Sequence, residues 1–179
     1  AEYYPLNMST FSIVILLVQS LFTSPLSLDF GASKAGQSWR PLNDGVMGGL
    51  SLGKASLEED VIRFEGAVSL ENNGGFASLR SPFGRYDLSG AKAVEIRLRV
   101  AKGQFALTME TEQVWFRPYY KHSIQVESND WEVVRIPLEE FHAYQVGRKM
   151  SQTLGDDALQ RIIRLGVVTD FKQAAPFEV

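Results

Sequence analysis

Residues 43–49, with the sequence NDGVMGG, place an amide and a carboxylate beside three glycines within seven residues. Three kinds of chemistry suit such a segment: a phosphate cradle, an all-oxygen cation site, or a tight turn. A phosphate-binding P-loop requires a Lys and a Ser or Thr after its glycines, at the start of a helix. Leu50, Ser51 and Leu52 follow Gly49 instead. The sequence therefore argues against phosphate binding and favours a turn.

The cation alternative depends on oxygen ligands. A calcium ion could use Asn43, Asp44 and Asn72 with backbone carbonyls, although no acidic spacing of the EF-hand kind is present. The chain has no cysteine, and His122 and His142 are its two histidines. We therefore expect no metal site and no cofactor.

Candidate catalytic groups are scattered along the chain. There is no G-x-S-x-G nucleophile elbow. Adjacent acids such as Glu139 and Glu140 would point to opposite faces of a strand, so they make a poor acid–base pair. We predict no catalytic residues and no enzymatic activity; a hydrolase dependent on His122 is the least supported hypothesis.

Composition and charge restrict the class of protein. The chain has 179 residues, 45% of them hydrophobic, with a net charge of −3. It carries no block of Lys and Arg that would bind phosphate backbones, so we expect no nucleic-acid partner. The length favours one folded domain, which we place at residues 26–179.

Residues 11–22, FSIVILLVQSLF, form an apolar run that is short for a membrane span. The run resembles the apolar part of an export signal, although no Lys or Arg precedes it and no A-x-A pattern follows. We interpret residues 1–25 as a leader and expect an exported or membrane-associated protein. The alternatives are a buried element of the fold and a mitochondrial location. The final residues, APFEV, read as the start of a strand, so we expect the chain to stop before a closing strand.

Alternation of apolar and polar residues is the dominant pattern from Leu26 onward, as in AVEIRLRV at residues 93–100. It predicts strands near residues 26–30, 61–70, 93–100, 104–110, 122–128, 131–138 and 164–171. Only residues 156–164 read as a helix, with Asp156 or Asp157 as its cap. Many short strands separated by turns predict an all-β sandwich or barrel.

The aromatic segment VWFRPYYKH, residues 114–122, has two possible arrangements. Trp115 and Tyr119 share one parity, and Phe116 and Tyr120 share the other. One set could fill the core while the other forms an exposed platform for sugar rings or a partner's side chains. The alternative is that core and loops cover both sets.

Four segments in sequence order resemble the complex I intermediate-associated protein family: residues 39–51, 64–80, 87–99 and 129–141. The likeness covers about residues 28–179. It implies a galactose-binding-like jelly-roll β-sandwich without catalytic residues. It also implies a chaperone-like assembly role with a protein partner, such as a subunit of a respiratory membrane complex.

The two glycine-rich segments, NDGVMGG and NNGGF, suit tight turns and close backbone contacts. We expect them to meet at one rim of the sandwich, with Val46, Met47 and Phe76 as apolar contacts. A β-carbon at Gly48 is expected to collide there. The binding residues predicted from the sequence are Asn43, Asp44, Met47, Asn72, Asn73, Phe76, Trp115 and Tyr119. The alternative function is a carbohydrate-binding module with an oligosaccharide ligand.

Overall fold

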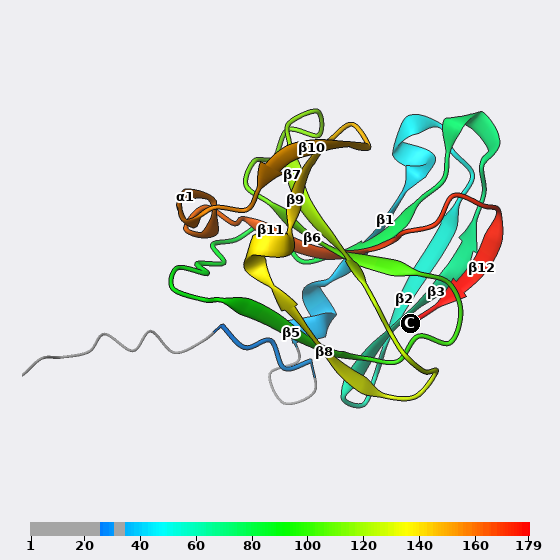
Figure 1. Cartoon of the computed structure of the whole chain (residues 1–179). Coiled ribbons are helices and arrows are strands. Elements are labelled where there is room, and N and C mark those ends of the chain that lie inside the picture. The colour runs from blue at the N-terminus through cyan, green and yellow to red at the C-terminus, as the bar shows by residue number, and fades with distance from the viewer. Residues whose placement is uncertain (1–25, 31–34) are drawn as a thin grey trace, which may run out of the picture.

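Strands dominate the computed structural model, which describes residues 26–30 and 35–179 (Figure 1). The strands in these residues are β1 (Arg40–Asn43), β2 (Leu52–Glu58), β3 (Val61–Val68), β4 (Ala77–Arg80), β5 (Ala93–Leu98), β6 (Phe105–Glu110), β7 (Tyr119–Ile124), β8 (Glu132–Pro137), β9 (His142–Gln145), β10 (Arg148–Thr153), β11 (Arg164–Thr169) and β12 (Ala175–Glu178). The helical elements are short: η1 (Ala35–Ser38), η2 (Asp44–Met47), η3 (Glu71–Asn73), η4 (Leu138–Glu140) and α1 (Asp156–Leu159).

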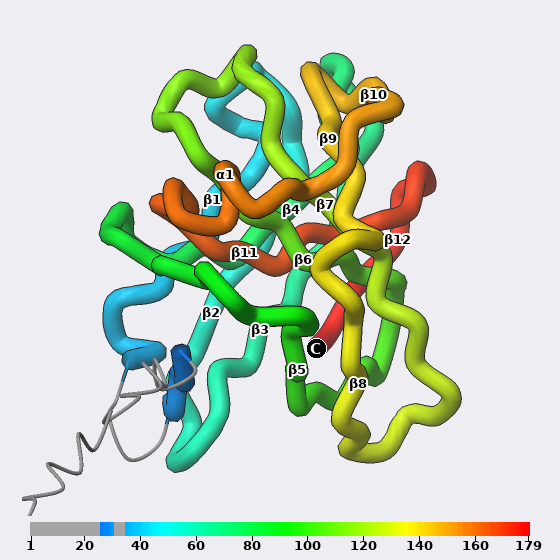
Figure 2. Tube along the Cα trace, turned by 60° about the vertical axis from the view of Figure 1, so that its left-hand side comes forward, coloured from blue at the N-terminus to red at the C-terminus, as the bar shows by residue number. Residues whose placement is uncertain are grey.

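Seven strands form the larger sheet in the order β1-β4-β11-β6-β7-β9-β10. β12, β3 and β2 form a three-stranded sheet, and β5 pairs with β8. In both views β2, β3, β5 and β8 lie below the strands of the larger sheet (Figures 1 and 2). This arrangement confirms the predicted jelly-roll β-sandwich.

The core lies between the larger sheet and the two smaller sheets. Phe105 of β6 packs against Phe177 of β12 with ring centroids 6.1 Å apart, and Phe177 packs against Phe64 of β3 at 4.9 Å. All three rings are almost fully buried. Leu98 of β5 and Ile136 of β8 belong to the same cluster. The burial of these side chains holds the layers together, because burying a large apolar side chain stabilises a fold by about 1.5–3 kcal/mol.

Two sequence-based assignments differ from the structure. Residues 26–30 do not form the predicted strand; Phe30 instead packs its ring edge against Trp39, with centroids 5.5 Å apart. The predicted helix is only the four residues of α1, and its N-cap is Gly155 rather than an aspartate. Ile162 is nevertheless buried as expected, because the loop after α1 carries it into the core.

No helix within residues 26–30 and 35–179 has the length and apolar character needed to cross a membrane. The apolar run at residues 11–22, which led us to predict a leader, lies outside the described residues.

Candidate functional site

Asp44 is the centre of the glycine-rich segment and is only 1% exposed. Its Oδ1 accepts the backbone N–H of Ser51 at 2.9 Å. Its Oδ2 accepts the Ser51 hydroxyl at 2.5 Å and the backbone N–H groups of Gly75 at 2.6 Å and Phe76 at 3.2 Å. One carboxylate therefore joins the two glycine-rich segments, which meet as predicted.

The surroundings of Asp44 stabilise its own ionised carboxylate and do not form a site for a bound cation. Burial by itself would raise the pKa of Asp44, but the hydrogen bonds from Ser51, Gly75 and Phe76 hold the pKa below its ordinary value. A calcium ion needs oxygen ligands, whereas N–H and O–H donors occupy both carboxylate oxygens. Within the part of the chain that the structure describes, no group of three or more His, Cys, Asp or Glu residues could hold a metal ion.

The crowded glycines are not the one we expected. A β-carbon at Gly49 would collide with the Asp44 carboxyl group, and one at Gly74 would lie 2.6 Å from the Oδ2 of Asp44. A β-carbon at Gly48 would have no atom within 4 Å, and the φ angle of Gly48 is +88°. The predicted collision at Gly48 is therefore wrong: this position requires glycine for its backbone conformation.

The remaining predicted residues of these segments are exposed or serve the local backbone. Val46 is 68% exposed and Met47 is 60% exposed, so neither supplies the apolar contact that we expected. Asn43 donates its side-chain N–H to a β2 carbonyl oxygen at 3.1 Å. Asn72 and Asn73 are exposed, with φ values of 55° and 59°. Half-buried Phe76 contributes its backbone N–H to Asp44, and a binding role for these residues stays a prediction.

The aromatic segment divides between a loop and a strand. Trp115 and Phe116 lie in the loop between β6 and β7 and are 71% and 50% exposed. The interpretation that all these aromatics are covered is therefore wrong. Tyr120 is buried in the core, and Tyr119 lies on the opposite face of β7. The parity that grouped Trp115 with Tyr119 has no structural meaning, because a strand begins only at Tyr119.

The face of the larger sheet that points away from the core, called the outer face here, brings together residues far apart in sequence. The register places Arg80 opposite Gly166, Gly166 opposite Thr108, and Thr108 opposite Lys121. Small residues occupy the middle of this face, and longer side chains lie around them. The outer face includes Ser78, Arg80, Ala106, Thr108, Glu110, Tyr119, Lys121, Ser123, His142, Tyr144, Arg164, Gly166 and Val168.

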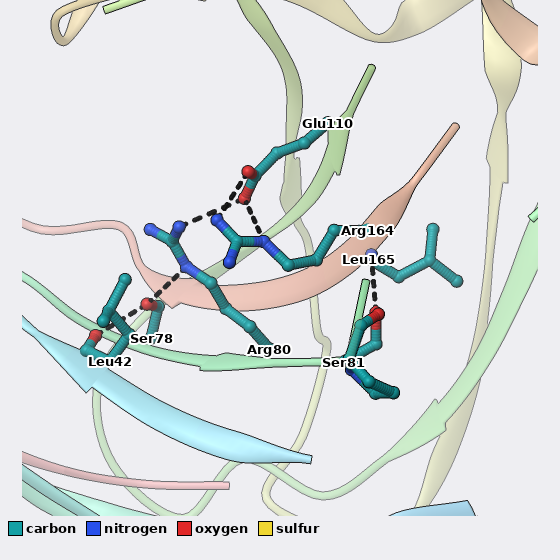
Figure 3. A network of polar contacts seen from close by, with 8 residues as sticks. Leu42, Ser78, Arg80, Ser81, Glu110, Arg164 and Leu165 are labelled. Atoms are coloured by element: carbon teal, nitrogen blue, oxygen red, sulfur yellow. Dashed lines mark hydrogen bonds and ion pairs between the residues drawn. The ribbon is translucent and has the colours of Figure 1, made fainter. Parts of the chain in front are cut away.

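An arginine cluster lies at one end of the outer face (Figure 3). Arg164 donates from Nε and Nη2 to the two carboxylate oxygens of Glu110 at 3.0 and 2.6 Å. Arg80 donates from Nη1 to the same carboxylate at 3.1 Å and from Nε to the Ser78 hydroxyl at 3.0 Å. Ser78 in turn donates to the Leu42 carbonyl oxygen at 2.7 Å. One carboxylate thus holds two guanidinium groups, and the cluster keeps a net positive charge.

A second cluster lies on the β7 side of the same face. Lys121 pairs with Asp170 at 2.7 Å, and Asp170 also accepts the Ser123 hydroxyl. The Lys121 ammonium lies 4.4 Å from the centroid of the Tyr144 ring. Tyr144 stacks on Tyr119, with ring centroids 6.1 Å apart and an interplanar angle of 28°. Tyr119, predicted as a binding residue, therefore belongs to a charged and aromatic surface.

The charged groups of the outer face are largely withdrawn from water. The side chains of Arg80, Glu110 and Arg164 are 23%, 14% and 17% exposed. Burial lowers the pKa of Arg80 and raises the pKa of Tyr119. Burial would also raise the pKa of Asp170, but its bonds to neighbouring side chains hold that pKa below its ordinary value. Partly buried ion pairs contribute little to stability relative to apolar packing of similar volume, so these pairs are not explained as a major source of stability.

Sequence reasoning did not identify Arg80, Glu110, Arg164 or Lys121. The available signal was parity: Glu110 and Arg164 occupy the outward positions of the two predicted strands that contain them. That signal does not reveal which strands are neighbours: β11 lies between β4 and β6, although Arg164 of β11 follows Glu110 of β6 by 54 positions.

Comparison with solved structures supports the fold. The chain is similar to the Family 11 Carbohydrate-Binding Module of cellulosomal cellulase Lic26A-Cel5E of Clostridium thermocellum, with a TM-score of 0.55 and 16% identity over 79% of this chain and 83% of the other. A second structure of a Family 11 module from Clostridium thermocellum, in complex with a β-1,3-1,4-mixed-linked tetrasaccharide, matches with a TM-score of 0.56 and 16% identity over 79% and 84% of the two chains. A search of curated protein sequences found no match.

Comparison with family models identifies the family. The model of Complex I intermediate-associated protein 30 matches residues 28–179, which span both glycine-rich segments and every strand described above. The match agrees with the resemblance carried by the four sequence segments. The chain belongs to the Complex I intermediate-associated protein 30 (CIA30) family.

Proposed function

We propose that this chain is a non-catalytic assembly module that holds a protein partner, a subunit of a respiratory membrane complex, against its outer face. The family supports the assembly role. The arginine cluster is the observation that supports the site. It presents two guanidinium groups on a sheet face that the core does not use.

The cluster is suited to an acidic segment of the partner. Glu110 holds both arginines in fixed positions, so little side-chain entropy is lost on binding. Within the described residues, Nη2 of Arg80 and Nη1 of Arg164 donate no hydrogen bond, so their N–H groups can donate to a carboxylate or carbonyl oxygen of a partner. Planar guanidinium groups are well suited to bind carboxylates.

Affinity purification from the native host tests this proposal. Arg80→Gln removes one donor group but leaves the two-bond pairing of Arg164 with Glu110, so the fold is retained. Arg135→Gln is the matched control, because Arg135 is an exposed arginine of β8 paired with Glu95. We expect Arg80→Gln to reduce recovery of the partner about tenfold and Arg135→Gln to leave it unchanged. Equal recovery from the two variants, with equal melting temperatures, would contradict the proposal.

A second candidate function is oligosaccharide binding, favoured by the stacked Tyr119 and Tyr144 rings on the same face. One structural neighbour was solved with a tetrasaccharide bound. Calorimetric titration with β-glucan oligosaccharides distinguishes the two candidates. Saturable heat for the wild type that is lost in Tyr144→Ala would support the sugar ligand. No heat from any oligosaccharide, together with recovery of a protein partner, supports the assembly module.

A further inference from the structure

Two loop tips lie side by side at one end of the sandwich, at the upper edge of Figures 1 and 2. The first is a turn between β6 and β7, closed by a hydrogen bond from the Arg117 N–H to the Val114 carbonyl oxygen at 2.9 Å. Trp115 and Phe116 occupy its two central positions and are 71% and 50% exposed. Val114 is 43% exposed. The outermost part of this turn is therefore apolar.

The second tip is the turn that joins β9 to β10. The side-chain N–H of Gln145 donates to the Phe116 carbonyl oxygen at 3.1 Å, which fixes the two tips together. Val146 at this tip is 62% exposed and has a φ of 48°, and Gly147 has a φ of 73°. Asn or Asp is the usual residue before glycine in such a turn, and a β-branched residue with positive φ is strained. A strained valine that packs against no core indicates that an apolar side chain is required at this place.

Basic residues adjoin both apolar tips. Arg148 and Lys149 follow Val146 and are exposed, and Arg117 closes the first turn. Glu112 is the acid of the first loop, and it lies 3.6 Å from Arg117. Exposed aromatic side chains with neighbouring Lys and Arg are typical of segments that lie in the interface of an anionic bilayer.

We propose that the apolar tip, formed by Val114, Trp115, Phe116 and Val146, inserts into the headgroup region of an anionic lipid bilayer. A lipid surface fits better than a protein pocket, because two exposed turns present apolar side chains outward and carry basic residues beside them. The η2 loop, with exposed Val46 and Met47, lies at the same end of the sandwich and adds apolar contact area (Figures 1 and 2). Insertion would place the protein beside a membrane complex while the outer face stays available to a partner.

Flotation of the full chain with phosphatidylcholine vesicles, with and without phosphatidylserine, tests this proposal. We expect binding to the anionic vesicles, weakened by high salt. The double variant Trp115→Ser with Phe116→Ser should bind about tenfold more weakly or worse, because it loses most of the apolar area of the tip. Residues 1–25 are the same in the wild type and the variants, so a difference in vesicle binding between them comes from the tip. Equal vesicle binding of the wild type and the double variant would overturn the proposal.

Val146→Asn separates membrane binding from folding. Asparagine suits positive φ, so this variant should melt at a higher temperature and yet bind vesicles severalfold more weakly. Val133→Asn on β8 is the matched control, since Val133 is also 62% exposed but lies away from the tip. Vesicle binding lowered equally by both changes, or by neither, would refute the insertion of the tip.

Tryptophan emission identifies the inserted residue. Vesicles with brominated acyl chains should quench wild-type emission, and Trp115→Phe should abolish most of the quenching while flotation is retained. If the double variant loses the protein partner in affinity purification and keeps vesicle binding, the tip is a protein contact and the proposal fails. Arg80→Gln, which tests the outer face, should leave vesicle binding unchanged.

Discussion

Replacing Asp44 with asparagine tests how strongly one carboxylate holds the two glycine-rich segments. In Asp44→Asn the amide oxygen can take the position of Oδ2 and accept the bonds of the Ser51 hydroxyl, Gly75 and Phe76. The amide NH₂ group then faces the backbone N–H of Ser51, which loses its acceptor. The substitution keeps the shape of the side chain and removes its charge and one acceptor.

The expected cost follows from these bonds. Bonds to a charged acceptor contribute about 1.5–3 kcal/mol each and neutral bonds about 0.5–1.5, so three weakened bonds lose about 3 kcal/mol. The buried N–H of Ser51 adds about 1–3 kcal/mol. We expect the free energy of unfolding to fall by about 5 kcal/mol, a large part of the total for a domain of this size.

Urea unfolding at about pH 7 measures this difference against wild type. Asp87→Asn is the matched control. Asp87 is exposed, and within the described residues its carboxylate bonds to nearby Ser89 and Arg85, so the loss of its charge should cost under about 1 kcal/mol. If Asp44→Asn is as stable as Asp87→Asn, the carboxylate is not the link between the two segments.

The pH dependence gives a second test of the same residue. The folded pKa of Asp44 is depressed, so its stabilising contribution is complete above the ordinary pKa of about 3.9 and is lost as the pH falls through the folded pKa. The stability difference between wild type and Asp44→Asn should therefore shrink below about pH 4. A difference that stays constant from neutral pH to about pH 3 would refute the assignment of the depressed pKa to Asp44.

Three further changes test other parts of the structure by thermal or urea unfolding. Glu110→Gln leaves two half-buried guanidinium groups without their shared carboxylate and should lower the free energy of unfolding by about 2 kcal/mol. Glu95→Gln at an exposed pair should lower it by under about 1 kcal/mol, and equal losses would contradict the arginine cluster. Gly66→Ala should cost about 3 kcal/mol, because its β-carbon would overlap the Leu52 carbonyl oxygen of the neighbouring strand, and a neutral result would contradict that approach. Val146→Asn should stabilise the protein by about 1 kcal/mol, and a loss of stability would contradict the strain assigned to that turn.

Much of the fold could be predicted because its central strands have one buried and one exposed face. The alternation at residues 93–100 and 104–110 indicates β5 and β6 directly. Short or polar strands such as β1 (Arg40–Asn43) and β10 (Arg148–Thr153) carry too few apolar positions to show a period. Residues 26–30 alternate as well, but they join no sheet, and Phe30 packs against Trp39 instead.

The candidate site was less predictable because it depends on contacts between distant segments. Asp44 reads as an ordinary turn residue, and its buried state follows from bonds to Gly75 and Phe76, which lie more than thirty positions away. The outer face depends on the register of β4 against β11, which a single sequence does not reveal. The exposure of Trp115 depends on a loop that the parity argument treated as a strand.

The most direct test of the central claim is site-specific photo-cross-linking in the native host. A photo-reactive phenylalanine analogue replaces Tyr144 on the outer face in one variant and Val133 on β8 in the other. The account predicts a covalent adduct with a subunit of a membrane complex from position 144 and none from position 133. An adduct from position 133 alone, or from neither position while the partner still co-purifies, would contradict the outer face as the binding surface.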